Sequence, residues 1–159
     1  MAELKRIFES LGLKEVETFI ASGNVIFRSR SAKPEALETR IEKQLGKSLG
    51  FDVSTLIRST SELADIVALD LFPGSVTPAS TLYVGLLKSA PDSDARQRVL
   101  ALRTPTDEFR VEGRELYWLC HIKSMDSIVS LGRLEKAAMR PATFRNITTI
   151  RKLAAKYCE

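Results

Sequence analysis

Two β-hairpin patterns, each flanked by amphipathic helices, constrain the fold of this 159-residue chain more than any other feature. The second hairpin alternates apolar and polar side chains over residues 108–120, around a Glu-Gly-Arg-Glu turn. A nearly continuous apolar run, typical of a strand that is covered on both faces or central in its sheet, lies upstream of it. The full order in this half is strand 80–87, helix 89–102, hairpin 108–120, helix 126–139 and strand 141–145. This order is that of the ferredoxin-like βαββαβ unit.

The first half repeats most of this order. Its pattern predicts helix 2–11, strands 16–21 and 25–30 around Ser22-Gly23-Asn24, helix 34–49 and strand 53–58. Ser59 and Glu62 have the spacing of a capping box, which predicts a third helix up to Leu71. Relative to the second half, only an opening strand is missing. We therefore predict an α+β fold of two ferredoxin-like halves related by duplication, with a C-terminal helix from Asn146.

The boundary between the halves is predicted from a break in the pattern. Residues 72–79 contain two prolines and one glycine, which interrupt both helices and strands. We therefore expect a first, incomplete half over residues 1–72, a linker over 73–79 and a second half over 80–159.

Composition excludes several classes of function. One histidine and two cysteines are too few for most metal sites. The adjacent Cys120 and His121 would point to opposite faces of a strand, so they cannot act as a nucleophile and its base. Neither a membrane helix, which needs roughly 18 to 20 apolar residues, nor a secretion signal is present in the sequence. We predict a cytoplasmic protein with two reduced thiols, no cofactor, no metal and no membrane partner.

Positive charge is concentrated at the C-terminal end of the sequence. From residue 120 onward, eight basic residues accompany three acidic ones, whereas 16 basic and 17 acidic residues precede that point. A basic segment of this kind attracts nucleic acid or other polyanions. The alternative interpretation is a solvated basic face without a partner.

The junction before the last helix is the main candidate for a ligand site. A helix that begins at Asn146 presents free backbone N–H groups at its first turn. Together with the Arg145 guanidinium and the hydroxyls of Thr148 and Thr149, these groups could bind an anion. The hairpin turn is a second candidate. The candidate anion- or ligand-binding residues are Arg145, Asn146, Thr148, Thr149, Arg151, Ser22 and Asn24. The alternative is structural: Asn146 only caps the helix and Arg145 pairs with a carboxylate.

Three segments, Met1–Leu4, Ser22–Val25 and Thr143–Leu153, give the chain a resemblance to a bacterial family known as domain of unknown function 1697. The resemblance implies an α+β fold of two ferredoxin-like halves, without an established activity or cofactor. The resemblance implies an opening strand and a glycine-containing loop, which family members usually carry upstream of the segment that matches Met1, and this sequence lacks both. We expect either that the sequence is truncated or that a partner chain, such as a second copy in a homodimer, supplies the missing pairing.

These observations predict a binding or interaction module. Its partner would be an anionic small molecule or nucleic acid at the basic C-terminal segment. The alternative is a small-molecule enzyme with a site between the two halves, in which Arg145 and Asn146 orient the substrate. Few side chains in the sequence are obvious general bases, which argues against the enzyme.

Overall fold

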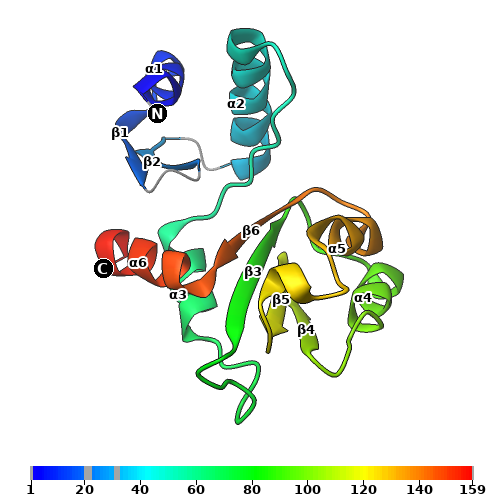
Figure 1. Cartoon of the computed structure of the whole chain (residues 1–159). Coiled ribbons are helices and arrows are strands. Elements are labelled where there is room, and N and C mark those ends of the chain that lie inside the picture. The colour runs from blue at the N-terminus through cyan, green and yellow to red at the C-terminus, as the bar shows by residue number, and fades with distance from the viewer. Residues whose placement is uncertain (1, 20–22, 31–32, 159) are drawn as a thin grey trace. The chain divides into compact units, whose positions relative to one another are not determined.

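The computed structural model describes residues 2–19, 23–30 and 33–158 and divides the chain into two compact units. The first unit comprises Met1–Arg58 and the second Ser59–Glu159. Each unit contains both helices and strands (Figure 1), so the predicted α+β class is confirmed.

The first unit is a hairpin with two helices. Its elements are α1 (Ala2–Ser10), β1 (Lys14–Phe19), β2 (Asn24–Arg28) and α2 (Pro34–Leu49). The strands pair in antiparallel fashion, as the sequence predicts. A proline begins α2, and Gly50, with a φ of 80°, ends it in the left-handed conformation that favours glycine. Helices and hairpin together bury a core of Ile7, Phe8, Leu13, Val16, Leu37, Ile41 and Leu45.

The prediction of a strand at residues 53–58 is wrong. Residues 52–58 belong to no strand in the described part of the chain. The N–H groups of Thr55 and Ile57 donate instead to the carboxylates of Glu42 and Glu38 on α2, at 2.7 and 3.1 Å. Val53 and Ile57 pack against the core. Two carboxylates of α2 therefore accept the backbone hydrogen bonds that the carbonyls of a neighbouring strand would accept in a sheet.

The second unit contains a four-stranded sheet. Its strands are β3 (Thr81–Leu87), β4 (Asp107–Glu112), β5 (Glu115–Cys120) and β6 (Ala142–Asn146). They lie in the order β4-β5-β3-β6, and every pairing is antiparallel. Helix α4 (Ser93–Leu100) connects β3 to β4, and α5 (Leu131–Ala138) lies between β5 and β6. This is the ferredoxin-like topology predicted for this half.

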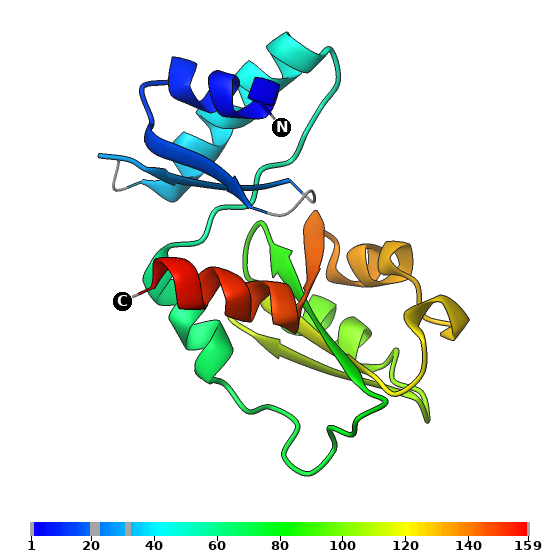
Figure 2. The ribbon, with the colours of Figure 1, turned by 60° about the vertical axis from the view of Figure 1, so that its left-hand side comes forward.

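Helices cover both faces of the sheet. Figures 1 and 2 show α4 and α5 on one face and α3 (Thr60–Ala68) and α6 (Ile147–Tyr157) on the other. The core beneath α4 and α5 includes Leu87, Val99, Phe109, Val111, Leu116, Trp118 and Leu134. Val84, Tyr117 and Leu119, which alternate with these residues along the strands, are also buried. The expectation that residues 80–87 are covered on both faces is confirmed.

The structure moves the boundary between the units to Arg58 and Ser59. Helix α3 packs against α6 in the second unit, and the Cys158 thiol donates to the Thr60 carbonyl at 3.0 Å. Phe72 is buried, with the Arg110 guanidinium 5.1 Å from its ring centre. The proline-rich stretch 73–79 is therefore a loop within the second unit, and its prediction as a linker is corrected.

The predicted helix 126–139 is shorter than expected. A 3₁₀ turn, η1 (Ser124–Asp126), comes first, and α5 begins only at Leu131 after a cap by the Ser130 hydroxyl, which accepts from the Arg133 N–H at 3.2 Å. Between them the chain is extended, because the Ser127 hydroxyl is held by Asp107. Ile128, expected on the buried side of a helix, is consequently 74% exposed.

Candidate functional site

Helix α6 presents a basic surface. Ile147, Ile150 and Leu153 form its buried stripe, as the periodicity predicts. On the opposite side, the side chains of Arg151, Lys152 and Lys156 are exposed, and the helix contains no acidic residue. We call these three residues the α6 basic face.

Asn146 caps this helix through its side chain. Its Oδ1 accepts a hydrogen bond from the Thr148 N–H at 2.9 Å, which satisfies one of the free amides of the first turn. Thr148 is exposed and Thr149 is partly buried. The predicted N-cap is confirmed. The same hydrogen bond engages Asn146 Oδ1 and the Thr148 N–H, two groups that could otherwise contact a ligand.

Arg145 is partly buried at the end of β6. It pairs in register with Val84 and so lies on the side of the sheet covered by α3 and α6. Its Nη1 donates to the Thr143 hydroxyl and to the Phe144 carbonyl, both at 3.0 Å. Burial lowers the pKa of the guanidinium. Arg145 is therefore tied to its own strand beside the α6 basic face.

The sequence-predicted site residues separate into two groups. Five of them, Arg145, Asn146, Thr148, Thr149 and Arg151, lie together where β6 meets α6. Asn24 lies at the start of β2 in the first unit, where its Nδ2 donates to the Phe19 carbonyl at 3.1 Å. Ser22 lies outside the described residues. The structure thus gathers the C-terminal candidates and places the hairpin candidate in another unit.

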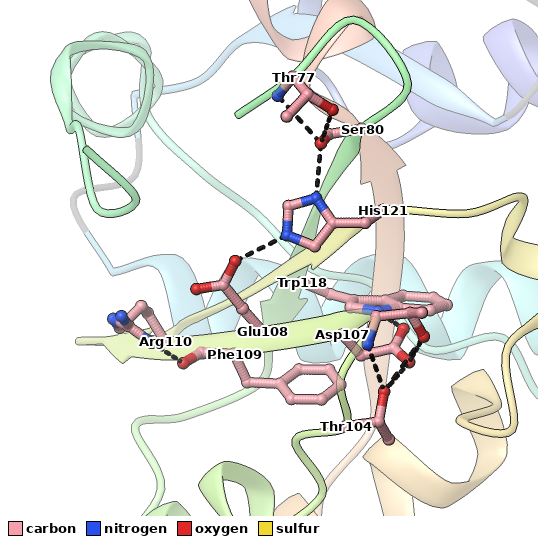
Figure 3. Close-up of polar contacts among 10 residues, drawn as sticks. Thr77, Ser80, Thr104, Asp107, Glu108, Phe109, Arg110, Trp118 and His121 are labelled. Carbon is pink, nitrogen blue, oxygen red and sulfur yellow. Dashed lines mark hydrogen bonds and ion pairs between the residues drawn. The ribbon is translucent and has the colours of Figure 1, made fainter. Parts of the chain in front are cut away.

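A second polar group, absent from the sequence predictions, lies at one end of the sheet (Figure 3). Ser80 directly precedes β3, His121 directly follows β5, and Glu108 lies on β4. The Ser80 Oγ is 2.7 Å from His121 Nδ1, and His121 Nε2 is 2.7 Å from Glu108 Oε2. An imidazole therefore joins a hydroxyl to a carboxylate. We call these three residues the Ser-His-Glu relay.

Asp107, beside the relay on β4, is fully buried. Four side chains donate to its carboxylate: Thr104 at 2.6 Å, Thr106 at 3.0 Å, Trp118 at 2.8 Å and Ser127 at 3.0 Å. Burial raises the pKa of this carboxyl, but the hydrogen bonds outweigh burial and hold the pKa below the ordinary value of 3.8. The ionised Asp107 carboxylate thus links the loop of Thr104 and Thr106 and the loop of Ser127 to Trp118 on β5.

Sequence reasoning missed the relay because its members come from three separate elements. Ser80 and His121 are 41 residues apart, and the pairing of Thr81 with Cys120 brings them together. The only signal in the sequence was His121 at the predicted end of a strand.

The Cys120 thiol takes no part in the relay. It is buried and donates to the Ile122 carbonyl at 3.1 Å, and burial raises its pKa. The exclusion of a Cys120–His121 pair therefore agrees with the structure. Within the described ranges, no group of three or more His, Cys, Asp or Glu side chains could hold a metal.

The fold and these two polar regions define an α+β protein whose larger unit has ferredoxin-like topology. A family model described as a protein of unknown function (DUF1697) matches residues 1–117, and the chain belongs to this family. The match ends within β5, so the resemblance at residues 143–153 stays a prediction.

One solved structure has a similar fold, that of the conserved bacterial protein SP0830 from Streptococcus pneumoniae. The two chains are 21% identical with a TM-score of 0.69, and the alignment covers 98% of this chain and 87% of that one. No curated protein matches the sequence. Among the described residues, no helix combines the length and the apolar character needed to span a membrane.

Proposed function

We propose that the protein is a binding module whose α6 basic face contacts a polyanion, with nucleic acid as the partner class. The observation that carries this proposal is the exposure of Arg151, Lys152 and Lys156 along one helix without an acidic residue. Long basic side chains on the outside of a helix suit a phosphate backbone, which passes over a surface and needs no enclosed cavity.

A small anionic ligand at the β6–α6 junction receives less support. Asn146 Oδ1 is engaged by the helix cap, and Arg145 donates to its own strand. The cap bond of Asn146 matches the alternative interpretation of the sequence, in which Asn146 only caps the helix. The α6 basic face, whose three side chains are exposed, is therefore the stronger candidate.

The expected result for the double variant Arg151→Ala/Lys152→Ala is weaker binding that also depends less on salt. Each phosphate contact contributes about −0.9 to the slope of log K against log salt on duplex DNA. Losing two contacts should reduce that slope by about 2. Fluorescence anisotropy with a labelled 20-base-pair DNA duplex and its RNA counterpart, at several salt concentrations, measures both affinity and slope.

The matched control is Lys43→Ala/Lys47→Ala, which removes two exposed lysines from α2, a helix that also carries glutamates. This control should bind as the parent protein does. Equal binding by the α6 variant and the parent, or a salt-independent affinity, would remove the α6 basic face from consideration.

We also propose that a second copy pairs with the first unit as a homodimer. The small sheet of the first unit supports this, because β1 and β2 form a sheet of two strands and a strand from a second copy would extend it. Sedimentation equilibrium should give a dimer. A monomer that unfolds in a single cooperative transition would contradict the proposal.

The proposed location is the cytoplasm. Cys120 and Cys158 are both free thiols, and Cys158 is only partly buried. Free cysteines without a disulfide framework are usual in a reducing compartment.

A further inference from the structure

The Ser-His-Glu relay is fixed by backbone contacts on both sides. The His121 N–H donates to the Thr106 carbonyl at 2.9 Å, and the Ser80 N–H donates to the Thr77 carbonyl at 3.0 Å. The segments that carry Ser80 and His121 are adjacent because β3 and β5 pair in register up to Thr81 and Cys120. The relay is therefore held by the sheet itself, the arrangement that a preorganised site needs.

The hydrogen bonds define a direction for proton transfer. We assign the Nε2–H of His121 as the donor to Glu108, because a carboxylate only accepts, and this tautomer leaves Nδ1 as an acceptor for the Ser80 hydroxyl. This combination of nucleophile, base and orienting carboxylate is the one that activates serine in hydrolases, with the two ring nitrogens exchanged. The Ser80 Oγ also accepts the Thr77 N–H at 3.1 Å and lies 2.9 Å from the Thr77 hydroxyl.

Solvent reaches the relay. The side chains of His121 and Glu108 are 24% and 32% exposed, and Thr77 at the edge of the loop is exposed. Asp107, its neighbour on β4, has no exposed surface and four donors on its carboxylate. Of these two neighbouring groups, the relay is the one that combines reactive side chains with access to solvent.

We propose that Ser80 and His121 are catalytic residues that hydrolyse small carboxylic esters, with Glu108 as a positioning residue. The Ser80 Oγ forms a bond to the acyl carbon while its proton passes to His121 Nδ1. The imidazolium gives that proton to the departing alcohol as the ester C–O bond breaks, which leaves acyl-Ser80. Water then attacks the acyl carbon, its proton moves through Nδ1 to the Ser80 oxygen, and a carboxylic acid is released.

Donors on the oxygen that carries developing charge favour such a step. The Thr77 hydroxyl, 2.9 Å from Ser80 Oγ, is the group we assign to this role. The proposal is independent of nucleic-acid binding, since it uses no residue of the α6 basic face.

The test uses the full chain and two probes, p-nitrophenyl acetate and diisopropyl fluorophosphate. We expect release of p-nitrophenol, and a diisopropylphosphoryl adduct that peptide mass spectrometry places on Ser80. Ser80→Ala should abolish the adduct and lower turnover at least about 100-fold, and His121→Gln should do nearly the same. Ser93→Ala, at the exposed start of α4, is the control and should react as the parent does.

Glu108→Gln distinguishes a positioning residue from a structural one. It should lower kcat about 10-fold or more and move the pH profile of kcat/KM, a change that loss of stability alone would not produce. A parent protein that forms no Ser80 adduct, or turnover that survives Ser80→Ala, overturns the proposal and leaves the relay as a tether for the loop 73–79. The adduct is read on the parent protein, so a variant that fails to fold does not remove the test.

Discussion

Asp107→Ala should lower the free energy of unfolding of the second unit by about 3–5 kcal/mol, among the largest losses expected from one substitution. The change leaves the buried Trp118 N–H without its acceptor and releases the hydroxyls of Thr104, Thr106 and Ser127. Trp118 is the only tryptophan in the sequence, so its fluorescence during urea unfolding reports this site directly.

Asp126→Ala is the control, because that aspartate lies exposed on η1 and should change stability by less than about 0.5 kcal/mol. A loss of the same size in both variants would contradict the role given to Asp107. Asp107→Asn should fall between them, since the amide keeps one acceptor oxygen and turns an N–H₂ group toward the hydroxyl donors.

The same carboxylate sets a dependence on pH. Its pKa is lower in the folded state than the ordinary 3.8, so its ionised form stabilises the fold above that pH. This contribution is lost as the pH falls below 3.8 and through the folded pKa. Comparing the parent with Asp107→Asn over this range should show that the parent loses more stability than the variant as the pH falls.

Glu38→Ala should lower the stability of the first unit by about 2–3 kcal/mol. Glu38 is only 1% exposed, and it accepts the Ile57 N–H at 3.1 Å. Without its carboxylate, a partly buried backbone donor loses its partner and a cavity remains beside the core. Hydrogen exchange at the Ile57 amide should accelerate, and urea unfolding measures the total loss.

Glu38→Gln is the conservative variant for this contact. It keeps an acceptor oxygen and nearly the same volume, so it should retain most of the stability and most of the protection at Ile57. Glu35→Ala, in the exposed first turn of the same helix, should leave the protection at Ile57 unchanged. Unaltered exchange in Glu38→Ala would show that the segment 52–58 is held by its apolar contacts alone.

Features that depend on neighbouring residues were predictable from the sequence. The capping box of Ser59 and Glu62, the Asn146 cap and both hairpins are formed as expected. Each of these signals lies within a few residues, where the physical preference of a turn or cap decides the structure.

Features that depend on tertiary contacts were not predictable in this way. The segment 53–58 has the composition of a strand, but α2 supplies carboxylates that compete for its amides. Ile128 has helical spacing, but Ser127 is held by Asp107 and the helix starts later. The five candidates at the junction of β6 and α6 could be predicted as one group because all lie between residues 145 and 151. Ser80, Glu108 and His121, in contrast, meet only through the pairing of strands in the sheet.

The strand order of the second unit also determines when this sheet can be completed during synthesis. β3 ends at Leu87, but its partner β6 begins at Ala142, and α6, which covers the same side as α3, comes later still. The first unit needs only residues up to Arg58 for all of its own contacts. A growing chain can therefore fold its first unit early. Strand β3, in contrast, has no partner strand β6 until more than 50 further residues have been synthesised.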